Sequence, residues 1–145
     1  MPNNAAIYIS DPSMIGSRLF DDIPAIEAYE DFSSNENATG FLLKMPWGHI
    51  KLNIMPSEHL PNHLKGFEGY IRNQQLSKDE LIYTLSRLYY VRMCLGCEIV
   101  HTSESEDDVI EFLASINSLL NGLMFIYDSV LDWNGEALCG PLKND

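Results

Sequence analysis

Hydrophobic and polar residues change their spacing several times along the chain, and each change predicts a different element. In the first half, short apolar runs and runs that alternate apolar with polar residues are typical of strands. We expect these strands at residues 5–9, 41–46 and 50–54. Residues 47–49 (Trp, Gly and His) separate the last two runs, so the sequence predicts a hairpin there.

The segment between the first two predicted strands has a weaker pattern. Residues 21–29 have the features of a short helix, with Asp22 as the N-cap and Pro24 in the first turn. The polar residues 33–37 predict a loop.

Three longer segments have the spacing of an amphipathic helix. Apolar residues recur every three or four positions over residues 57–74, 77–93 and 105–120. Ser77 and Glu80 match a capping box at the start of the second segment. Ser105 is the expected N-cap of the third segment, and Asn121-Gly122 the expected end.

Strands return after each of the last two helices. Short apolar runs predict them at residues 97–101, 123–127, 130–133 and 136–139. Asn134-Gly135 lies between the last two runs and is a strong hairpin signal. The order of elements predicts one α+β domain over residues 1–145, with an antiparallel or mixed sheet and three main helices packed on one face.

The composition is typical of a folded domain, because 145 residues of which 46% are hydrophobic can bury a substantial core. No apolar run approaches the roughly 18 residues of a helix that spans a bilayer. The first residues also lack the basic and apolar regions of a secretory signal. Together these features predict a cytoplasmic protein.

Charge is spread unevenly along the chain. Residues 1–43 carry seven acidic residues and one basic residue, residues 44–97 four acidic and seven basic, and residues 98–145 ten acidic and one basic. The formal net charge is -12. Such acidity argues against nucleic acid and anionic membranes as partners, since both are bound through clustered Lys and Arg. It predicts a basic protein as the partner.

The candidate partner-binding residues come from the acidic C-terminal part of the chain. Tyr and Trp side chains among acids are a common interface composition, and Trp133 lies at a predicted turn. Part of the acidic cluster at residues 104–111 is also explained locally, because carboxylates in the first turn of a helix suit its dipole. The candidates are Glu104, Glu106, Asp107, Asp108, Asp128, Asp132 and Trp133.

Cysteine and histidine provide no recognisable catalytic or metal motif, so we expect no cofactor. Cys94 and Cys97 form a C-x-x-C, but the helical pattern places it at a helix C-terminus, where the dipole disfavours a thiolate. An odd total of three cysteines fits a reducing compartment better than a disulfide framework. We therefore expect structural cysteines.

An enzyme remains an alternative if the histidines meet in space. His59 and His63 stand four residues apart near a carboxylate, but the Glu of a zinc-peptidase motif does not follow the first His. His49 and His101 have no recognisable nucleophile beside them in the sequence. A deep pocket converging on these side chains would favour the enzyme class.

The second half of the chain resembles small bacterial proteins of toxin–immunity clusters. The similarity runs from Arg87 to Leu138 and includes the acid-rich residues 103–108 (Ser-Glu-Ser-Glu-Asp-Asp), a helix ending in residues 120–125, and residues 132–135 (Asp-Trp-Asn-Gly). It implies a small cytoplasmic immunity protein that neutralises a basic toxin, such as a nuclease, by covering its active site with complementary charge.

A second resemblance is to type III secretion chaperones, which are also small, acidic and α+β. It implies a homodimer that binds an extended segment of an effector. Their usual order begins with a helix followed by three strands, whereas this chain begins with a predicted strand.

Overall fold

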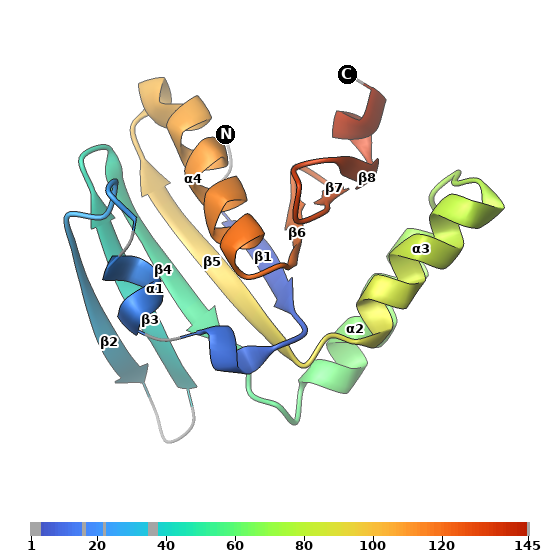
Figure 1. Cartoon of the computed structure of the whole chain (residues 1–145), viewed down its shortest axis with the longest axis horizontal. Coiled ribbons are helices and arrows are strands. Elements are labelled where there is room, and N and C mark those ends of the chain that lie inside the picture. Colours follow the sequence, from blue (N-terminus) through green and yellow to red (C-terminus); the bar gives the residue numbers. More distant parts are fainter. Residues whose placement is uncertain (1–3, 16, 22, 35–37, 145) are drawn as a thin grey trace.

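The residues that the structure describes form a single antiparallel sheet of eight strands (Figure 1). The computed structural model describes residues 4–15, 17–21, 23–34 and 38–144. The strands lie in the order β2-β3-β4-β5-β1-β6-β7-β8. Their bounds are β1 Asn4–Ile9, β2 Ala28–Ser34, β3 Ala38–Met45, β4 Gly48–Ile54, β5 Met93–His101, β6 Leu123–Ile126, β7 Ser129–Leu131 and β8 Ala137–Cys139.

Three main helices connect and cover these strands. They are α2 Leu60–Arg72, α3 Lys78–Tyr89 and α4 Glu106–Leu119, and a shorter α1 spans Ser17–Asp21. Short 3-10 turns occur at Pro12–Met14 (η1), Ser103–Ser105 (η2) and Pro141–Asn144 (η3). The predicted α+β class, with an antiparallel sheet and three main helices, is confirmed.

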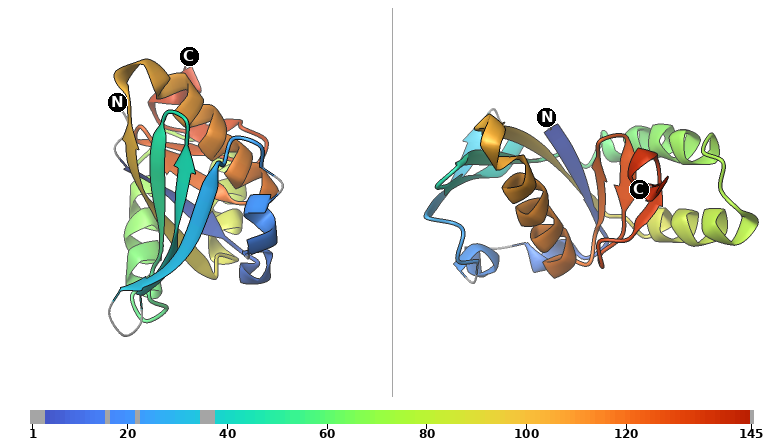
Figure 2. Two further views of the ribbon diagram at one scale, coloured as in Figure 1. Left: turned by 90° about the vertical axis from the view of Figure 1, so that its left-hand side faces the viewer. Right: turned by 90° about the horizontal axis from the view of Figure 1, so that it is seen from above.

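The helices lie on both faces of the sheet, however, and not on one face as predicted. Ile7 and Ile9 of β1 pack in a core with α4 and α1, whereas Tyr8 packs in a second core with α2 and α3. The physical reason is visible in β1, whose three consecutive residues Ile7, Tyr8 and Ile9 are almost completely buried. A continuous apolar run in a central strand requires cover on both faces. In Figure 1 and in the right-hand view of Figure 2, α4 lies over the strands on the left, whereas α2 and α3 lie together on the right.

The region before β3 departs most from prediction. Residues 21–29 do not form one helix: α1 ends at Asp21, and β2 begins at Ala28. The Glu27 N–H donates to the Lys44 carbonyl at 2.8 Å, so pairing with β3 determines the backbone there. β2 also extends to Ser34 into the predicted loop, while residues 35–37 and the proposed N-cap Asp22 lie outside the described residues.

The N-termini of α3 and α4 can be compared with the predicted caps. Ser77 and Glu80 form both hydrogen bonds of the capping box, as expected. Ser105 does not cap α4 through its side chain, because its hydroxyl hydrogen-bonds with that of Thr102 at 2.6 Å. α3 ends at Tyr89, earlier than its apolar spacing predicts, and β5 begins at Met93. The Arg92 N–H donates to the Ile9 carbonyl at 2.8 Å, so sheet pairing again overrides the helical pattern.

Candidate functional site

The acidic residues around the start of α4 form an exposed surface. Glu104, Asp107 and Asp108 are exposed, as a partner-binding role requires. Glu106 is partly covered, and its carboxylate accepts a hydrogen bond from the Tyr127 hydroxyl. Burial and this carboxylate raise the pKa of Tyr127 to about 12. Glu106 therefore helps to hold the β6–β7 turn against α4.

Asp128 occupies a strained turn beside that contact. Tyr127 and Asp128 have φ angles of 53° and 58°, in the left-handed region that favours glycine. The Tyr70 hydroxyl of α2 donates to the Asp128 carbonyl. The Asp128 residue itself is exposed, so its carboxylate is accessible to a partner.

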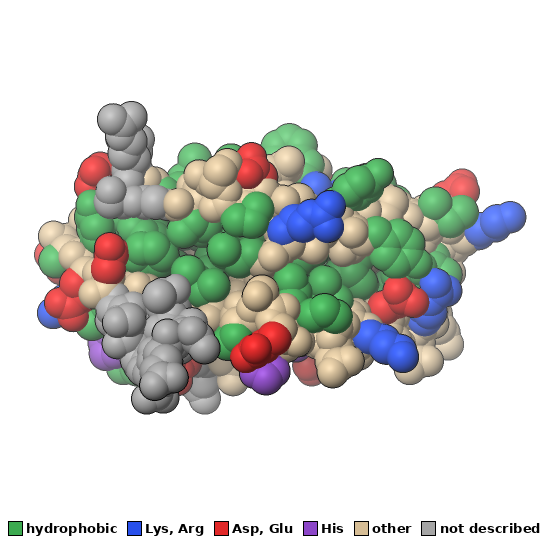
Figure 3. Space-filling view, turned by 90° about the horizontal axis from the view of Figure 1, so that it is seen from below, with side chains coloured by type: hydrophobic (Ala, Val, Ile, Leu, Met, Phe, Trp, Pro, Cys, Tyr) green, Lys and Arg blue, Asp and Glu red, His purple; other side chains and the backbone are tan. Residues whose placement is uncertain are grey.

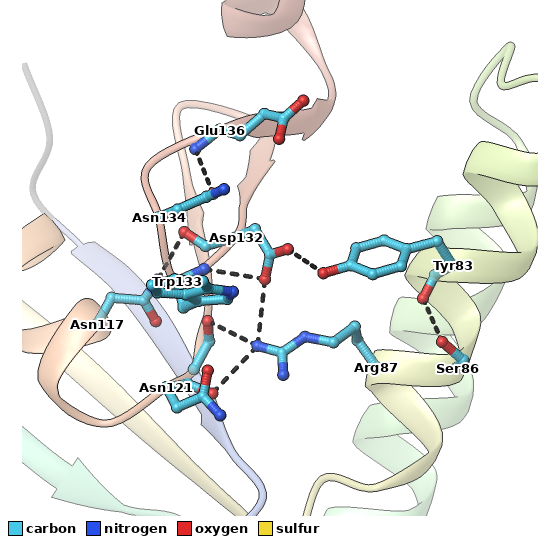
Figure 4. A network of polar contacts seen from close by, with 10 residues as sticks. Tyr83, Ser86, Arg87, Asn117, Asn121, Asp132, Trp133, Asn134 and Glu136 are labelled. Carbon is cyan, nitrogen blue, oxygen red and sulfur yellow. Dashed lines mark hydrogen bonds and ion pairs between the residues drawn. The ribbon is translucent and has the colours of Figure 1, made fainter.

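Asp132 points inward, unlike the outward role expected for it. Its side chain is only 4% exposed and forms an ion pair with Arg87 at 3.2 Å. Its carboxylate also accepts hydrogen bonds from the Tyr83 hydroxyl and, at 2.9 Å, from the Trp133 backbone N–H (Figure 4). A buried carboxylate with these partners joins α3 to the end of β7 and is not available to another protein.

Arg87 completes this connection. Its guanidinium donates to the carbonyls of Asn121 and Gly122 at 3.1 and 3.3 Å, so α3 is tied to the end of α4 as well. Sequence reasoning missed Arg87 and Tyr83 because their carboxylate partner lies far along the chain. Arg87 also lies opposite Leu85 on the predicted helix, so the apolar spacing contained no signal for a buried ion pair there.

Trp133 lines two neighbouring concave regions of the surface. Its residue is 46% exposed, at the loop between β7 and β8. The larger region, which we call the α4 groove, has a volume of about 740 Å³. Its lining consists of Ile23, Pro24, Ala25, Trp47, Asp108, Glu111, Phe112, Ala114, Ser115, Ser118, Leu119, Trp133, Asn134 and Gly135.

The α4 groove combines an apolar surface with acidic residues. Leu119 is 48% exposed and, with Trp47 and Trp133, gives the groove large apolar side chains. Asp108 and Glu111 line it from exposed positions on α4. Of the predicted site residues, the structure thus brings Asp108 and Trp133 together in one groove, and adds Glu111 from the same acidic cluster.

The smaller region, which we call the α3 hollow, shares Trp133 and Asn134 with the groove and lies beside α3. Its volume is about 350 Å³. Its lining consists of Asp79, Glu80, Tyr83, Thr84, Asp132, Trp133, Asn134, Glu136, Ala137, Leu138 and Lys143. The Lys143 ammonium donates to the Glu80 carboxylate, and this contact together with the Ser77 backbone N–H lowers the pKa of Glu80 to about 2.

Basic side chains gather elsewhere on the molecule. Lys65, Arg72 and Lys78 are exposed on α2 and α3. Seen from below, most of the visible Lys and Arg side chains lie over these two helices (Figure 3). The acidic groove and the basic helices thus occupy different regions of the surface.

The histidines do not converge on either concave region. His63 hydrogen-bonds with the Tyr8 hydroxyl at 2.8 Å, and His59 lies beside Glu58 at the surface. His101 Nδ1 is 2.6 Å from the Thr102 carbonyl oxygen, and His49 lies on β4. Within the described part of the chain, no three His, Cys, Asp or Glu side chains are placed to hold a metal ion.

Cys94 and Cys97 lie in β5 and not at the end of a helix as predicted. Cys94 belongs to the core beneath α2 and α3, and Cys97 to the core beneath α4, so the two side chains point to opposite faces of the sheet. Cys139 is also buried, and all three are free thiols. Burial raises the pKa of Cys94 to about 12, which suits a structural role.

The chain matches no protein-family model, and neither a curated protein nor a solved structure is significantly similar to it. No helix in the described residues combines the length and the apolar character needed to cross a membrane. The functional argument therefore rests on the geometry of the α4 groove and the α3 hollow.

Proposed function

We propose that this protein is a binding protein of the immunity type, which neutralises a basic bacterial toxin by holding a segment of it in the α4 groove. The groove itself is the observation that carries the proposal. Exposed Leu119 and Trp133 offer apolar contact area, and Asp108 and Glu111 supply negative charge beside it. Buried aromatic and aliphatic anchors supply most of the affinity of an interface, and complementary charge speeds encounter and selects the partner.

The acidic surface extends beyond the groove. Glu104 and Asp107 lie exposed at the start of α4, and Asp128 is exposed at the β6–β7 turn that contacts this helix through Tyr127. A basic protein that enters the groove would face negative charge along this end of the molecule. Such a surface fits a toxin that itself binds a polyanion, because its active site must be basic.

The first test is capture of the partner with matched variants. Three proteins are immobilised separately: wild type, Leu119→Glu, and Tyr90→Glu as the control. Each is exposed at low salt to lysate of the organism that encodes the protein. Both substitutions place a carboxylate at an exposed apolar position, but Tyr90 lies beyond the end of α3, outside the groove. We expect to capture a basic protein with both wild type and Tyr90→Glu. Leu119→Glu should bind the same protein at least about tenfold more weakly.

The second test is neutralisation. The captured protein should stop growth when it is expressed alone, and co-expression of this chain, but not of Leu119→Glu, should restore growth. Equal binding by wild type and Leu119→Glu would contradict the role of the groove. A harmless client held in extended form by a homodimer would contradict the immunity class and favour the secretion chaperone.

A further inference from the structure

We propose that the α3 hollow receives one basic side chain of the protein partner, as a second contact next to the α4 groove. The inference rests on the proposed function, since the basic side chain comes from the same partner. Trp133 and Asn134 line both regions, so the groove and the hollow are neighbours, and a segment lying in the groove has the hollow within reach.

The first argument is the balance of charge inside the hollow. Four carboxylates line it, and two of them already have cations: Asp132 is paired with Arg87, and Glu80 with Lys143. Asp79 and Glu136 are exposed, and no cation among the described residues forms an ion pair with either. The hollow thus has an excess of negative charge that a cation from outside would neutralise.

The second argument is that the hollow already holds a cation of the chain itself. The Lys143 ammonium lines it and bonds to Glu80 from the C-terminal turn η3. This contact shows that an aliphatic stem ending in a positive charge fits against α3.

The third argument is the aromatic wall. Tyr83 and Trp133 both line the hollow, and the Tyr83 hydroxyl is fixed by Asp132, as Figure 4 shows. Aromatic faces attract Lys and Arg side chains, and more often Arg. Carboxylates and aromatic rings in a partly enclosed space are the surroundings that a guanidinium group prefers.

The hollow can be tested without the partner. The probe is N-acetyl-arginine amide, and the control is N-acetyl-citrulline amide, which has nearly the same shape without the charge. In a Trp47→Phe variant, Trp133 is the only tryptophan, so its fluorescence and its indole N–H signal in NMR spectra report on the hollow. We expect saturable changes with the arginine compound and none with the citrulline compound at equal ionic strength.

Substitutions of residues that line the hollow should weaken or strengthen binding of the arginine compound, depending on the charge that they remove. Asp79→Asn with Glu136→Gln should weaken it by about threefold to tenfold, whereas the exposed control pair Glu27→Gln with Glu30→Gln should leave it unchanged. Lys143→Met should strengthen it by freeing Glu80, and Lys65→Met on α2 should not. Circular dichroism and thermal unfolding confirm that each variant is folded.

The outcomes separate this inference from the proposed function. Saturable arginine binding that depends on Asp79 and Glu136, in a protein for which no partner is captured, supports the hollow and contradicts the immunity role. A partner that binds through the groove and is unaffected by the Asp79 and Glu136 changes overturns the hollow. Absence of saturable arginine binding, or equal binding of the citrulline compound, overturns it as well.

Discussion

Asp132 is a buried residue that positions the loop next to it and does not itself lie on the exposed surface of the site. Its carboxylate is almost fully buried, and Arg87, Tyr83 and the Trp133 backbone satisfy it. These contacts hold the loop that carries Trp133 against α3. The predicted acidic contact is therefore a positioning residue, whereas Trp133 beside it remains free to meet a partner.

Removing the Asp132 carboxylate should destabilise the protein strongly. Asp132→Ala leaves the Arg87 guanidinium partly buried without its anion, and breaking such a pair costs about 3 kcal/mol of unfolding free energy. Urea unfolding followed by circular dichroism measures the change. Asp128→Asn is the matched control, because that residue is exposed and its loss of charge should cost less than about 0.5 kcal/mol. Equal stability of the two variants would contradict the assigned role of Asp132.

The three cysteines should be protected in the native state. Each is buried and free, and burial raises the thiol pKa, which reduces the reactive thiolate. Iodoacetamide at pH 8 should therefore modify all three thiols quickly in denaturant and only slowly without it, as mass spectrometry would show. Rapid modification of native Cys94 and Cys97 would indicate an accessible C-x-x-C site instead.

At the scale of elements, the β6–β7 turn combines strain with anchoring. Two consecutive non-glycine residues adopt left-handed conformations there, and contacts from Tyr70 and Glu106 hold the turn on both sides. One turn is thus in contact with both α2 and α4.

Substitution of Asp128 should reveal that strain. Asp128→Gly is expected to raise the unfolding free energy by about 0.5 kcal/mol, because glycine adopts positive φ without a steric cost. Asp128→Val should lower it by about 1–2 kcal/mol, since a β-branched side chain is poorly tolerated there. Thermal unfolding of both variants checks the prediction, and the reverse order would contradict it.

The C-terminal turn η3 is tied to α3 by Lys143 and Glu80, and this link should depend on pH. The folded-state pKa of Glu80 is lowered to about 2 from its ordinary 4.5. The stabilisation from its charged form is therefore complete above pH 4.5 and is lost as the pH falls toward 2. Unfolding measured between pH 6 and 2 should show wild type more stable than Lys143→Met at the upper end and the difference vanishing at the lower end. A difference independent of pH would contradict the ion pair.

At the scale of the whole molecule, acidic residues greatly outnumber basic residues, and the two kinds lie on different parts of the surface. The net charge of -12 places many like charges on one compact chain, while the exposed basic residues Lys65, Arg72 and Lys78 lie on α2 and α3. Repulsion among the acids destabilises the folded state, and salt screens it.

Raising NaCl from 20 to 500 mM should therefore increase the Tm by a few degrees. Differential scanning calorimetry measures the shift directly. The variant Asp107→Asn with Asp108→Asn removes two exposed charges of α4 and should show a smaller increase than wild type. A fall in Tm with salt would mean that attractive ion pairs outweigh the repulsion.

The sequence by itself determined the elements whose signals are local. The capping box at Ser77, the apolar spacing of α4 and the hairpin about Asn134-Gly135 each depend on neighbours in the chain, and all three are confirmed. The net acidity of the chain is likewise a property of composition alone.

Tertiary structure decided everything that depends on contacts between distant residues. Strand pairing placed residues 28–29, 33–34 and 93 in strands, although the sequence predicted helix or loop there, because backbone hydrogen bonds of the sheet outweigh weak local preference. The same long-range packing turned Asp132 inward onto Arg87 and brought Asp108 and Trp133 into one groove. Periodicity shows which side of a helix or strand is apolar. Only the packing of the whole sheet decides which other element that side contacts, and therefore which charged side chains stay exposed.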